Sequence, residues 1–432
     1  MKKILSFVLV VLMLASMLFV ACDSASKKSS YSEGLQYKKT SASECAVVGM
    51  GTCTDTDVVI PETSPEGLTV IRVSGFSNRT GIVSVTLPES VLEITDEAFK
   101  GCTNLQSINI PAATTKIERS AFFDCPALTT INVDAGNAKY SGTGNCVVDK
   151  ETNSLFWGCK NSEIPAGVTE IGVWAFANNA SITEIVIPEG VTTIGPKAFE
   201  NCSGLVSVTF PSSLTQIGRN AFDGCSALKS VTVPGNVCVI EESAFAHCSA
   251  LETVLIENGS DATSIGGMAF AECVNLKNVT LPDGLSVLGS GAFGYCSALT
   301  ELDLPDSLRY IDGNAFMECP NLMKNEQGVL YVDDWVVGCQ IGFDTYTIKE
   351  GTRGISAAAF YGCASMRTLY MPASVQYIGF AAFYQCSTLG SVYFGGTQSQ
   401  MQDLIEQAVG SNGLDNPDFK NAMHYWDYVP ET

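Results

Sequence analysis

Short runs of alternating apolar and polar residues return at a fixed interval along most of the chain. Residues 204–228 illustrate one unit, in which residues 207–210 follow the period-two pattern of a half-buried strand. Pro211 ends this run, because proline has no N–H group for a strand ladder. Phe222 and Cys225 follow at a spacing typical of a short helical turn. Each unit therefore predicts a short strand on one side and a helical turn on the other.

Phenylalanine preceded by alanine or glycine marks the register of this repeat. It recurs twelve times, and eight of the eleven intervals are 23 residues. Ten of the twelve phenylalanines have a cysteine three residues later, at Cys102, Cys125, Cys202, Cys225, Cys248, Cys273, Cys296, Cys319, Cys363 and Cys386. A single unit leaves strand edges and one apolar side uncovered, so the units must stack to bury them. The pattern predicts a repeat solenoid with short parallel strands on one face, helical turns on the other and about 23 residues per unit.

The repeating unit resembles the leucine-rich repeats of the BspA-like surface proteins of bacteria. Those units have the form Leu-x-x-Val-x-Leu-Pro…Ile-Gly-x-x-Ala-Phe-x-x-Cys, and the likeness covers roughly residues 59–395. The resemblance implies an α+β leucine-rich repeat fold in a bacterial surface lipoprotein. It also implies a non-catalytic role of adhesin type, in which the protein binds a protein or glycan partner. Because fold does not fix function, this role is an expectation from the family likeness alone.

Two segments depart from the repeat, at residues 145–159 and 328–339. Both run strand, acidic turn, strand and Gly-Cys, so we expect two β-hairpins that replace the helical turn of a unit. The solenoid then covers residues 76–395 with these two interruptions. We expect an N-terminal cap over residues 35–75 and a C-terminal cap over residues 396–432, because an open terminal turn would expose apolar surface and strand edges.

The expected C-terminal cap contains one helix and one strand. Met401, Leu404, Ile405 and Ala408 have helical spacing, and residues 421–425 read as a strand that returns to the solenoid. This arrangement also resembles the usual C-terminus of the family.

A charged and then apolar segment opens the chain. Two lysines precede an uncharged apolar run that ends at Ala21, which is typical of a secretory signal peptide over residues 1–21. The residues before Cys22 resemble a bacterial lipobox, so we expect lipid attachment at Cys22 and a flexible tether over residues 22–34. The alternative is an ordinary signal peptide in which Cys22 has no such role. The first interpretation places the protein outside the cell, held to a bacterial membrane through the N-terminal lipid only.

The chain has 17 cysteines, and their spacing decides between three interpretations. Disulfides between ladder positions would give identical neighbours different geometries. A metal site needs ligands that converge, whereas these residues form a line. A ladder of small buried thiols fits the repeat best, and Asn179 in the equivalent position fits it as well. Outside the ladder, Cys45 and Cys53 are the first pair to test for a disulfide.

Composition excludes several functions. The chain has 24 basic and 45 acidic residues, a net charge of −21, which argues against nucleic acid partners and against docking on anionic lipid. The two histidines leave little for imidazole or zinc chemistry, and motifs for nucleophilic, nucleotide-dependent or metalloprotease catalysis are lacking. We therefore expect no enzyme activity, no metal and no cofactor. We interpret Asp149, Asp333 and Asp334 as turn residues, a paired-carboxylate site being the weaker alternative, and His247 as a surface residue.

The outward residues of successive strands form the surface best suited to binding. In the middle of the chain they are Ser and Thr, as at Ser207 and Thr209, which equally suit a plain solvent-facing strand surface. Acidic and aromatic residues join them toward the C-terminus, and together these suit a protein or glycan partner. The candidate binding face consists of Glu301, Asp303, Thr368, Tyr370, Ser391 and Tyr393.

We therefore expect the protein to be a monomeric, non-catalytic binding protein at the cell surface. One alternative is an envelope-bound module that captures glycan or peptide for an uptake or enzyme system. Another is a structural spacer of the envelope. We expect Trp157 and Trp335 to pack within the hairpins rather than to contact a partner.

Overall fold

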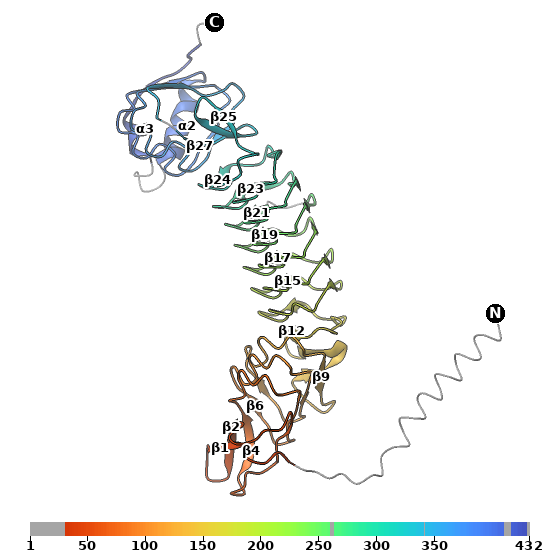
Figure 1. Ribbon diagram of the computed structural model, residues 1–432. Coiled ribbons are helices and arrows are strands. Elements are labelled where there is room, and N and C mark those ends of the chain that lie inside the picture. Colours follow the sequence, from red (N-terminus) through yellow and green to blue (C-terminus); the bar gives the residue numbers. More distant parts are fainter. Residues whose placement is uncertain (1–30, 260–262, 341, 410–415, 430–432) are drawn as a thin grey trace, which may run out of the picture.

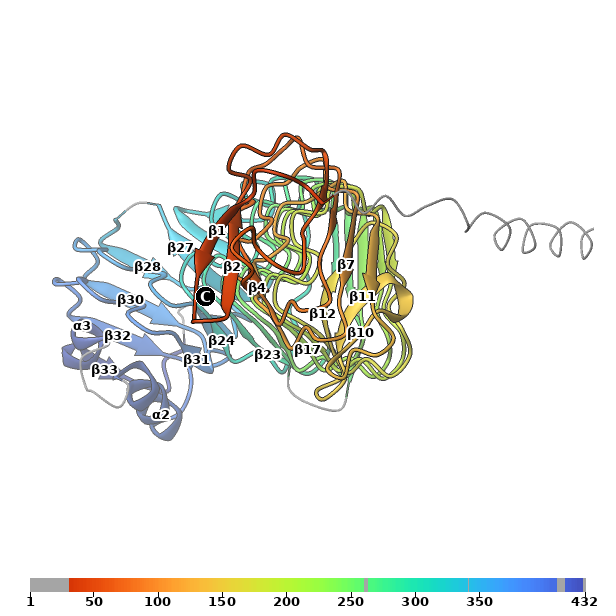
Figure 2. The ribbon, with the colours of Figure 1, turned by 90° about the horizontal axis from the view of Figure 1, so that it is seen from below.

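The computed structural model describes residues 31–259, 263–340, 342–409 and 416–429. The chain winds into about 15 turns of roughly 23 residues, stacked into a curved rod with the N-terminal turns at one end (Figure 1). Seen along the rod, the C-terminal unit is displaced to one side of the middle turns (Figure 2). Within these residues no helix is both long enough and apolar enough to cross a membrane.

The first strand of each regular turn builds a surface that we name the strand face. Its strands pair in parallel with the equivalent strand of the next turn, and they form four separate sheets. The sheets are β3 (Asp57–Val59), β5 (Ser84–Thr86), β7 (Ser107–Ile110) and β9 (Thr130–Val133); β14 (Glu184–Val186) and β16 (Ser207–Thr209); β18 (Ser230–Val233), β20 (Thr253–Ile256) and β22 (Asn278–Thr280); and β28 (Thr345–Thr347), β30 (Thr368–Met371), β32 (Ser391–Phe394) and β33 (Met423–Tyr425).

A second, shorter strand in each turn, absent from the sequence-based expectation, builds another surface of the rod. In the N-terminal region β1 (Gln36–Lys39) pairs antiparallel with β2 (Glu44–Gly49), and β4 (Thr69–Val73), β6 (Glu93–Ile94) and β8 (Lys116–Ile117) follow in parallel. The middle sheet contains β10 (Tyr140–Ser141), β11 (Cys146–Asp149), β12 (Ser154–Gly158), β13 (Glu170–Ile171), β15 (Thr193–Ile194), β17 (Gln216–Ile217), β19 (Val239–Ile240), β21 (Thr263–Ile265), β23 (Leu285–Leu288) and β24 (Tyr310–Ile311). The last sheet contains β25 (Lys324–Glu326), β26 (Val329–Val332), β27 (Trp335–Cys339), β29 (Gly354–Ile355) and β31 (Tyr377–Ile378).

The segments around each Ala-Phe pair are tight turns, and the prediction of helical turns there is wrong. The N–H of Phe222 donates to the carbonyl of Ala244 in the next turn of the solenoid, at 2.7 Å, so it closes no helical bond. Asn220 and Gly224 have left-handed backbone angles, with φ of 54° and 74°. Such residues do not continue a right-handed helix. The three-residue spacing of Phe and Cys therefore reflects consecutive turns.

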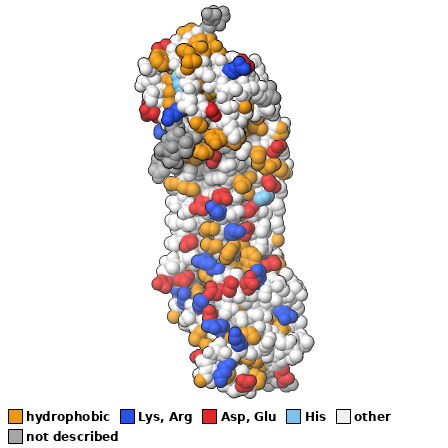
Figure 3. Space-filling model, turned by 90° about the vertical axis from the view of Figure 1, so that its left-hand side faces the viewer, with side chains coloured by type: hydrophobic (Ala, Val, Ile, Leu, Met, Phe, Trp, Pro, Cys, Tyr) orange, Lys and Arg blue, Asp and Glu red, His pale blue; other side chains and the backbone are white. Residues whose placement is uncertain are grey.

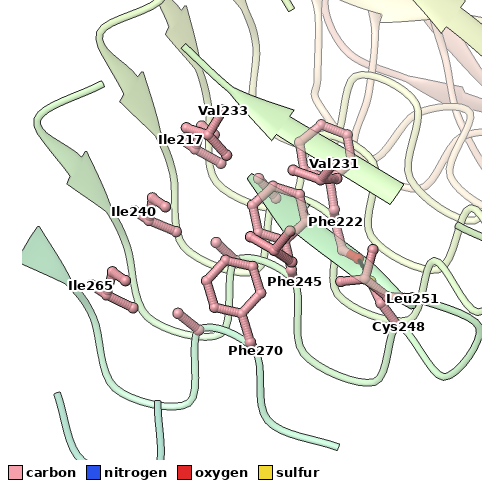
Figure 4. Packing of buried hydrophobic residues seen from close by; sticks show 14 of the residues in the cluster. Ile217, Phe222, Val231, Val233, Ile240, Phe245, Cys248, Leu251, Ile265 and Phe270 are labelled. Carbon is pink, nitrogen blue, oxygen red and sulfur yellow. Dashed lines mark hydrogen bonds between the residues drawn. The ribbon is translucent and has the colours of Figure 1, made fainter. Parts of the chain in front are cut away.

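Phenylalanine rings form the centre of the core. Phe199 and Phe222 stack with ring centroids 4.9 Å apart, and Phe222 and Phe245 with centroids 5.1 Å apart. In Figure 4 the rings of Phe222, Phe245 and Phe270 lie one behind another, beside a parallel row of isoleucines from the second strand. All of these phenylalanines are fully buried. Stacking the turns thus buries the apolar side of each unit against the apolar side of its neighbour.

Two antiparallel hairpins interrupt the stack and divide the core into three clusters. Hairpin 1 is β11 and β12, with β10 added on one edge, and hairpin 2 is β26 and β27, with β25 added. Alternate side chains of each hairpin belong to different clusters. In hairpin 1, Val147 and Trp157 face the N-terminal cluster, whereas Val148 and Leu155 face the middle cluster. A short 3-10 helix, η1 (Thr143–Asn145), leads into hairpin 1.

The C-terminal cap has the helix and the returning strand that the spacing predicts. Helix α2 (Gln398–Val409) buries Met401, Leu404 and Ala408 against the last turns. A short helix, α3 (Pro417–Asn421), leads into β33, which pairs in parallel with β32. The fully buried Asn416 ends the turn-to-turn ladder, because its side-chain oxygen accepts the N–H of Phe383 at 2.6 Å. The cap thus satisfies the N–H that a further turn would otherwise bind.

Candidate binding face

Four of the six candidate residues lie side by side on the last sheet of the strand face. Thr368 and Tyr370 of β30 are in register with Ser391 and Tyr393 of β32. The rings of Tyr370 and Tyr393 stack with centroids 4.9 Å apart and planes 21° apart. Parallel pairing with alternate residues outward therefore brings residues 23 positions apart into one aromatic surface.

Two further tyrosines, which the sequence analysis did not select, extend this surface. Tyr425 of β33 is in register with Tyr393, and their rings stack with centroids 4.6 Å apart. Tyr428 follows and leans on both Tyr370 and Tyr393, with centroids at 5.0 Å and 5.3 Å. We name Tyr370, Tyr393, Tyr425 and Tyr428 the tyrosine face. Tyr425 could have been found from the sequence, because it lies in the strand predicted at residues 421–425. If that strand pairs with the one that contains Tyr393, their register places Tyr425 beside Tyr393.

Glu301 and Asp303 lie elsewhere, and the expectation that they sit on a paired strand is wrong. Residues 300–303 are extended but are assigned to no sheet, and the neighbouring sheet ends at β22. Leu302 between them is still buried, so the alternation of side chains is kept. A shallow hollow opens between residues 300–303 and β22, and both acids line it. The candidate face is therefore two separate surfaces rather than one.

Polar side chains of hairpin 2, together with Arg353 that follows it, bind the backbone just after residues 300–303. The N–H of Leu304 donates to Asp333 at 2.9 Å, and the carbonyls of Leu304 and Pro305 accept from the guanidinium of Arg353 at 3.2 Å and 2.8 Å. Arg353 is 8% exposed and also donates two hydrogen bonds to Asp334, at 2.9 Å and 3.1 Å. Burial raises the pKa of Asp334, and the neighbouring Arg353 opposes that shift. The two acidic turn residues are thus structural, and these backbone groups are satisfied by side chains.

Charged side chains of both signs are mixed over the surface. Figure 3 shows the rod from the left-hand side of Figure 1, with Lys and Arg interspersed among Asp and Glu along the lower and middle turns. Ion pairs between neighbouring turns contribute to this mixing, as between Lys116 and Glu93 at 2.9 Å. On this side of the rod, positive and negative side chains therefore lie near one another, although the whole chain has a net charge of −21.

Nine of the ten ladder cysteines direct their sulfur at a phenylalanine carbonyl in the preceding turn. The Sγ···O distances are 2.9–3.3 Å for Cys102, Cys125, Cys202, Cys225, Cys248, Cys273, Cys296, Cys319 and Cys386. Burial raises the pKa of Cys202 and of Cys273 to about 12, so these thiols stay protonated at neutral pH. The ladder of free thiols predicted from the spacing is therefore present. The tenth member, Cys363, faces another cysteine instead.

The remaining cysteine and tryptophan expectations have clear outcomes. Cys45 and Cys53 are both free, and the sulfur of Cys45 contacts the carbonyl of Leu68 at 3.5 Å. Trp157 and Trp335 are buried in their hairpins, 5% and 1% exposed, as expected. Cys22, the predicted lipid attachment residue, lies outside the described residues, as does the predicted signal peptide over residues 1–21.

His247 lies on the outer side of its turn, with more than half of its side chain exposed, as expected. Its Nδ1 lies 2.7 Å from Asp223, and its Nε2 lies 3.4 Å from Glu272. The hydrogen bond with Asp223 raises the pKa of His247. Within the described part of the chain, no group of three or more His, Cys, Asp or Glu side chains is placed to hold a metal ion.

Comparison with known proteins places this geometry in a family. The sequence matches the BspA-type leucine-rich repeat region, described as six copies, over residues 53–144, 152–262, 256–327 and 337–425. No curated protein matches the chain. Among solved structures, it is similar to a leucine-rich repeat protein from Eubacterium ventriosum, with 20% identity, a TM-score of 0.49 and coverage of 68% of this chain and 95% of that one.

Two further solved structures are similar at comparable levels. A leucine-rich repeat protein from Bacteroides ovatus has 24% identity and a TM-score of 0.42, with coverage of 91% of this chain and 98% of that one. A leucine-rich cell surface protein from Faecalibacterium prausnitzii has 21% identity and a TM-score of 0.41, with coverage of 88% and 98%. The family assignment rests on the repeat match, which covers most of the chain. The chain belongs to the BspA-type leucine-rich repeat family.

Proposed function

We propose that this protein is a non-catalytic binding protein of the bacterial cell surface, of adhesin type, and that a protein or glycan partner docks on the tyrosine face. The observation that carries the proposal is the stack of Tyr370, Tyr393 and Tyr425 with Tyr428 against it. Equivalent outward positions in the middle of the rod hold no aromatic residue; most are small and polar, as at Thr209, and Val186 and Leu255 are aliphatic. The aromatic surface is therefore a local departure from an otherwise plain repeat.

Stacked tyrosines suit recognition for two physical reasons. Each ring provides a large apolar surface next to a hydroxyl that both donates and accepts hydrogen bonds. Rings that already hold one another in place lose little conformational entropy when a partner binds. Tyr428 is also fixed by its backbone, because its N–H donates to the carbonyl of Phe394 at 3.1 Å. Trp426, between Tyr425 and Tyr428 in the sequence, is 43% exposed.

The proposal includes the anchor predicted from the N-terminus. A lipid on Cys22 and a tether after it would hold the N-terminal end of the rod at the membrane. The predicted range of the tether, residues 22–34, is too long, because Ser32 is buried and its N–H donates to the carbonyl of Val59 at 2.9 Å. The tyrosine face lies in the C-terminal unit, at the opposite end of the rod (Figure 1). A partner outside the cell would then meet the tyrosine face far from the membrane.

A glycan and protein array probed with the purified chain tests the binding role. We expect binding to one class of partner, and we expect the double variant Tyr370→Ala with Tyr393→Ala to lose it. The matched control is Thr209→Ala with Thr232→Ala, which truncates outward residues in the middle sheets and leaves binding unchanged. Thermal unfolding shows whether each variant keeps its fold.

Other outcomes contradict the proposal in different ways. A hit that survives the tyrosine variant places the binding surface elsewhere, and the hollow lined by Glu301 and Asp303 is the next candidate. Chains that bind nothing on broad arrays favour the spacer role. Hydrolysis of a bound glycan or peptide contradicts the non-catalytic role.

A further inference from the structure

One position in the cysteine ladder departs from the other nine. In the regular ladder each sulfur meets the carbonyl of a phenylalanine one turn back, as Cys386 meets Phe360 at 3.2 Å. The turn before Cys363 is replaced by hairpin 2, which ends in Cys339 rather than in a phenylalanine. The sulfur atoms of Cys339 and Cys363 lie 2.6 Å apart. Hairpin 2 therefore places a second sulfur near the one ladder thiol that follows it.

This separation is too short for two atoms that only touch. Non-bonded heavy atoms rest at about 3.5–4.0 Å, whereas a disulfide bond is about 2.05 Å long. The 2.6 Å between these two sulfurs lies much nearer to the bonded distance. The two sulfur atoms therefore need to move only a little to form the bond.

Hairpin 1 shows that the pairing is specific to hairpin 2. It ends in Gly158-Cys159, the same plan, but the ladder position that follows it is Asn179. Cys159 instead accepts a hydrogen bond from the side-chain amide of Asn145 at 3.1 Å and contacts the hydroxyl of Ser162 at 3.6 Å. The chain thus contains a matched cysteine in a matched hairpin, with no thiol in the following ladder position.

We propose that Cys339 and Cys363 are an oxidisable pair, which closes a disulfide under oxidising conditions while the nine other ladder cysteines remain thiols. The thiolate of Cys339 attacks one sulfur of a low-molecular-weight disulfide, which forms a mixed disulfide and releases one thiolate. The sulfur of Cys363 then attacks Cys339, loses its proton to the departing group and releases the second thiol. Two protein thiols are oxidised, and the external disulfide is reduced to two thiols.

Exposure and acidity favour this order of events. Cys339 is partly exposed and Cys363 is buried, so the external disulfide reaches Cys339 first. The hydrogen bond from Cys363 lowers the pKa of Cys339, whereas burial raises the pKa of the ladder thiols. Thiolates react and thiols do not, so the ladder stays reduced when the pair is oxidised.

The disulfide would brace the unit that carries the tyrosine face. Strand β28 begins six residues after Cys339, and β30 begins five residues after Cys363. A covalent bond at this point ties the starts of two neighbouring strands of that sheet. Any effect on partner binding rests on the proposed function, whereas the formation of the bond does not.

Cysteine mapping on the full chain tests the pair. The reduced protein is incubated with oxidised glutathione, quenched in acid, denatured and alkylated, and any disulfide is then reduced and given a second label. We expect the second label on both Cys339 and Cys363, and the first label on the nine other ladder cysteines. With iodoacetamide on the folded, reduced protein, we expect Cys339 to react at least roughly tenfold faster than Cys202.

Two variants make the test specific. Cys339→Ser should remove the second label from Cys363, whereas Cys159→Ser, the matched change in hairpin 1, should leave that label in place. The proposal is overturned if Cys363 of the folded wild-type chain keeps the first label after oxidation, if Cys339 stops at the mixed disulfide, or if Cys363 pairs with another cysteine. The wild-type map decides the matter even where a variant does not fold. The array experiment is independent of this result.

Discussion

Hairpins 1 and 2 share one sequence plan but join the turns of the solenoid in different ways. At hairpin 1 the contact is apolar and close. Trp157 meets Phe122 with ring centroids 6.0 Å apart, and Gly158 leaves room for the ring of Phe176. At hairpin 2 apolar contacts are present too, as where Trp335 stacks on Tyr377, but a polar contact through Arg353 and the acidic turn is added, with the sulfur pair beside it. The C-terminal unit beyond hairpin 2 is displaced from the axis of the rod (Figure 2).

The difference shows that a hairpin inserted into the solenoid can join the cores on its two sides by apolar packing alone or with added polar contacts. Both hairpins turn alternate side chains toward different clusters, so each separates one column of buried residues from the next. Apolar packing at hairpin 1 keeps the next phenylalanine column against the hairpin. At hairpin 2 directed hydrogen bonds from Arg353 are added to the apolar packing. The strand face is interrupted at both hairpins. The following predictions test this contrast.

The largest effect is expected from Arg353→Ala, which removes the polar contact of hairpin 2. The substitution leaves the carboxylate of Asp334 and two backbone carbonyls without their donor, and we expect unfolding free energy to fall by about 3–5 kcal/mol. Chemical denaturation measures the change.

The matched substitution in hairpin 1 is Asp149→Ala. The carboxylate of Asp149 accepts the nearby backbone N–H groups of Glu151 and Thr152, so its loss should cost about 1 kcal/mol. If both substitutions cost the same, the polar joint is not special to hairpin 2.

A methyl group added at the glycine of the Gly-Cys end of each hairpin should destabilise the protein more at hairpin 1 than at hairpin 2, the reverse of the previous pair of substitutions. A Cβ at Gly158 would lie 2.0 Å from the ring of Phe176, whereas a Cβ at Gly338 would meet only the end of Leu330, at 3.6 Å. We expect Gly158→Ala to cost about 1–3 kcal/mol through overpacking. Gly338→Ala should stay within about 0.5 kcal/mol of wild type. Thermal unfolding of the two variants side by side measures the contrast, and equal melting temperatures would contradict it.

Much of the fold follows from the sequence because each turn repeats the same burial pattern. The 23-residue interval aligns equivalent residues, so parallel pairing of Tyr370 with Tyr393 could be predicted. The second strand could not, since a strand of two residues such as β17 has no visible period. The helical prediction failed because a three-residue spacing is also produced by successive turns with left-handed residues such as Asn220.

The part of the candidate site that depends on strand register, around Tyr370 and Tyr393, could be predicted from the sequence. The parts that depend on contacts between residues far apart in the chain could not. Glu301 and Asp303 have the alternation of a strand, yet residues 300–303 join no sheet. The backbone that follows them is bound by Arg353, about fifty residues away, which the repeat does not relate to it. The contact of Cys339 with Cys363 depends on how hairpin 2 replaces a turn, which the spacing does not encode. Such contacts arise between elements that the repeat does not relate.

A smaller effect is expected from Asn145→Gly, which tests the entry to hairpin 1. The side chain of Asn145 accepts the N–H of Ile131 and donates to the carbonyl of Thr129, both at 2.7 Å. Glycine keeps the left-handed backbone, with φ of 59°, and removes these two bonds together with the hydrogen bond to Cys159, so we expect a loss of about 1–2 kcal/mol. Asn145→Ala should lose about 1 kcal/mol more, because alanine is strained at this φ. Equal losses in the two variants would show that the backbone angle contributes nothing.

The smallest effect is expected in the regular turns between the hairpins, where His247 bonds to Asp223 and Glu272. The folded state raises the pKa of His247, so its contribution is fully present below the unfolded value of about 6.5 and is lost as the pH rises through the folded value. The group is largely exposed, so screening limits the effect to about 0.5 kcal/mol or less.

Denaturation of wild type and His247→Gln on both sides of that pH window measures this contribution. The wild-type advantage should be present on the acid side and vanish on the alkaline side. The differences caused by Gly158→Ala and Arg353→Ala should not change when His247→Gln is added, because these sites share no contact. A wild-type advantage that grows with pH would contradict the sign, and a change in either hairpin variant would show that the regular turns couple the two joints.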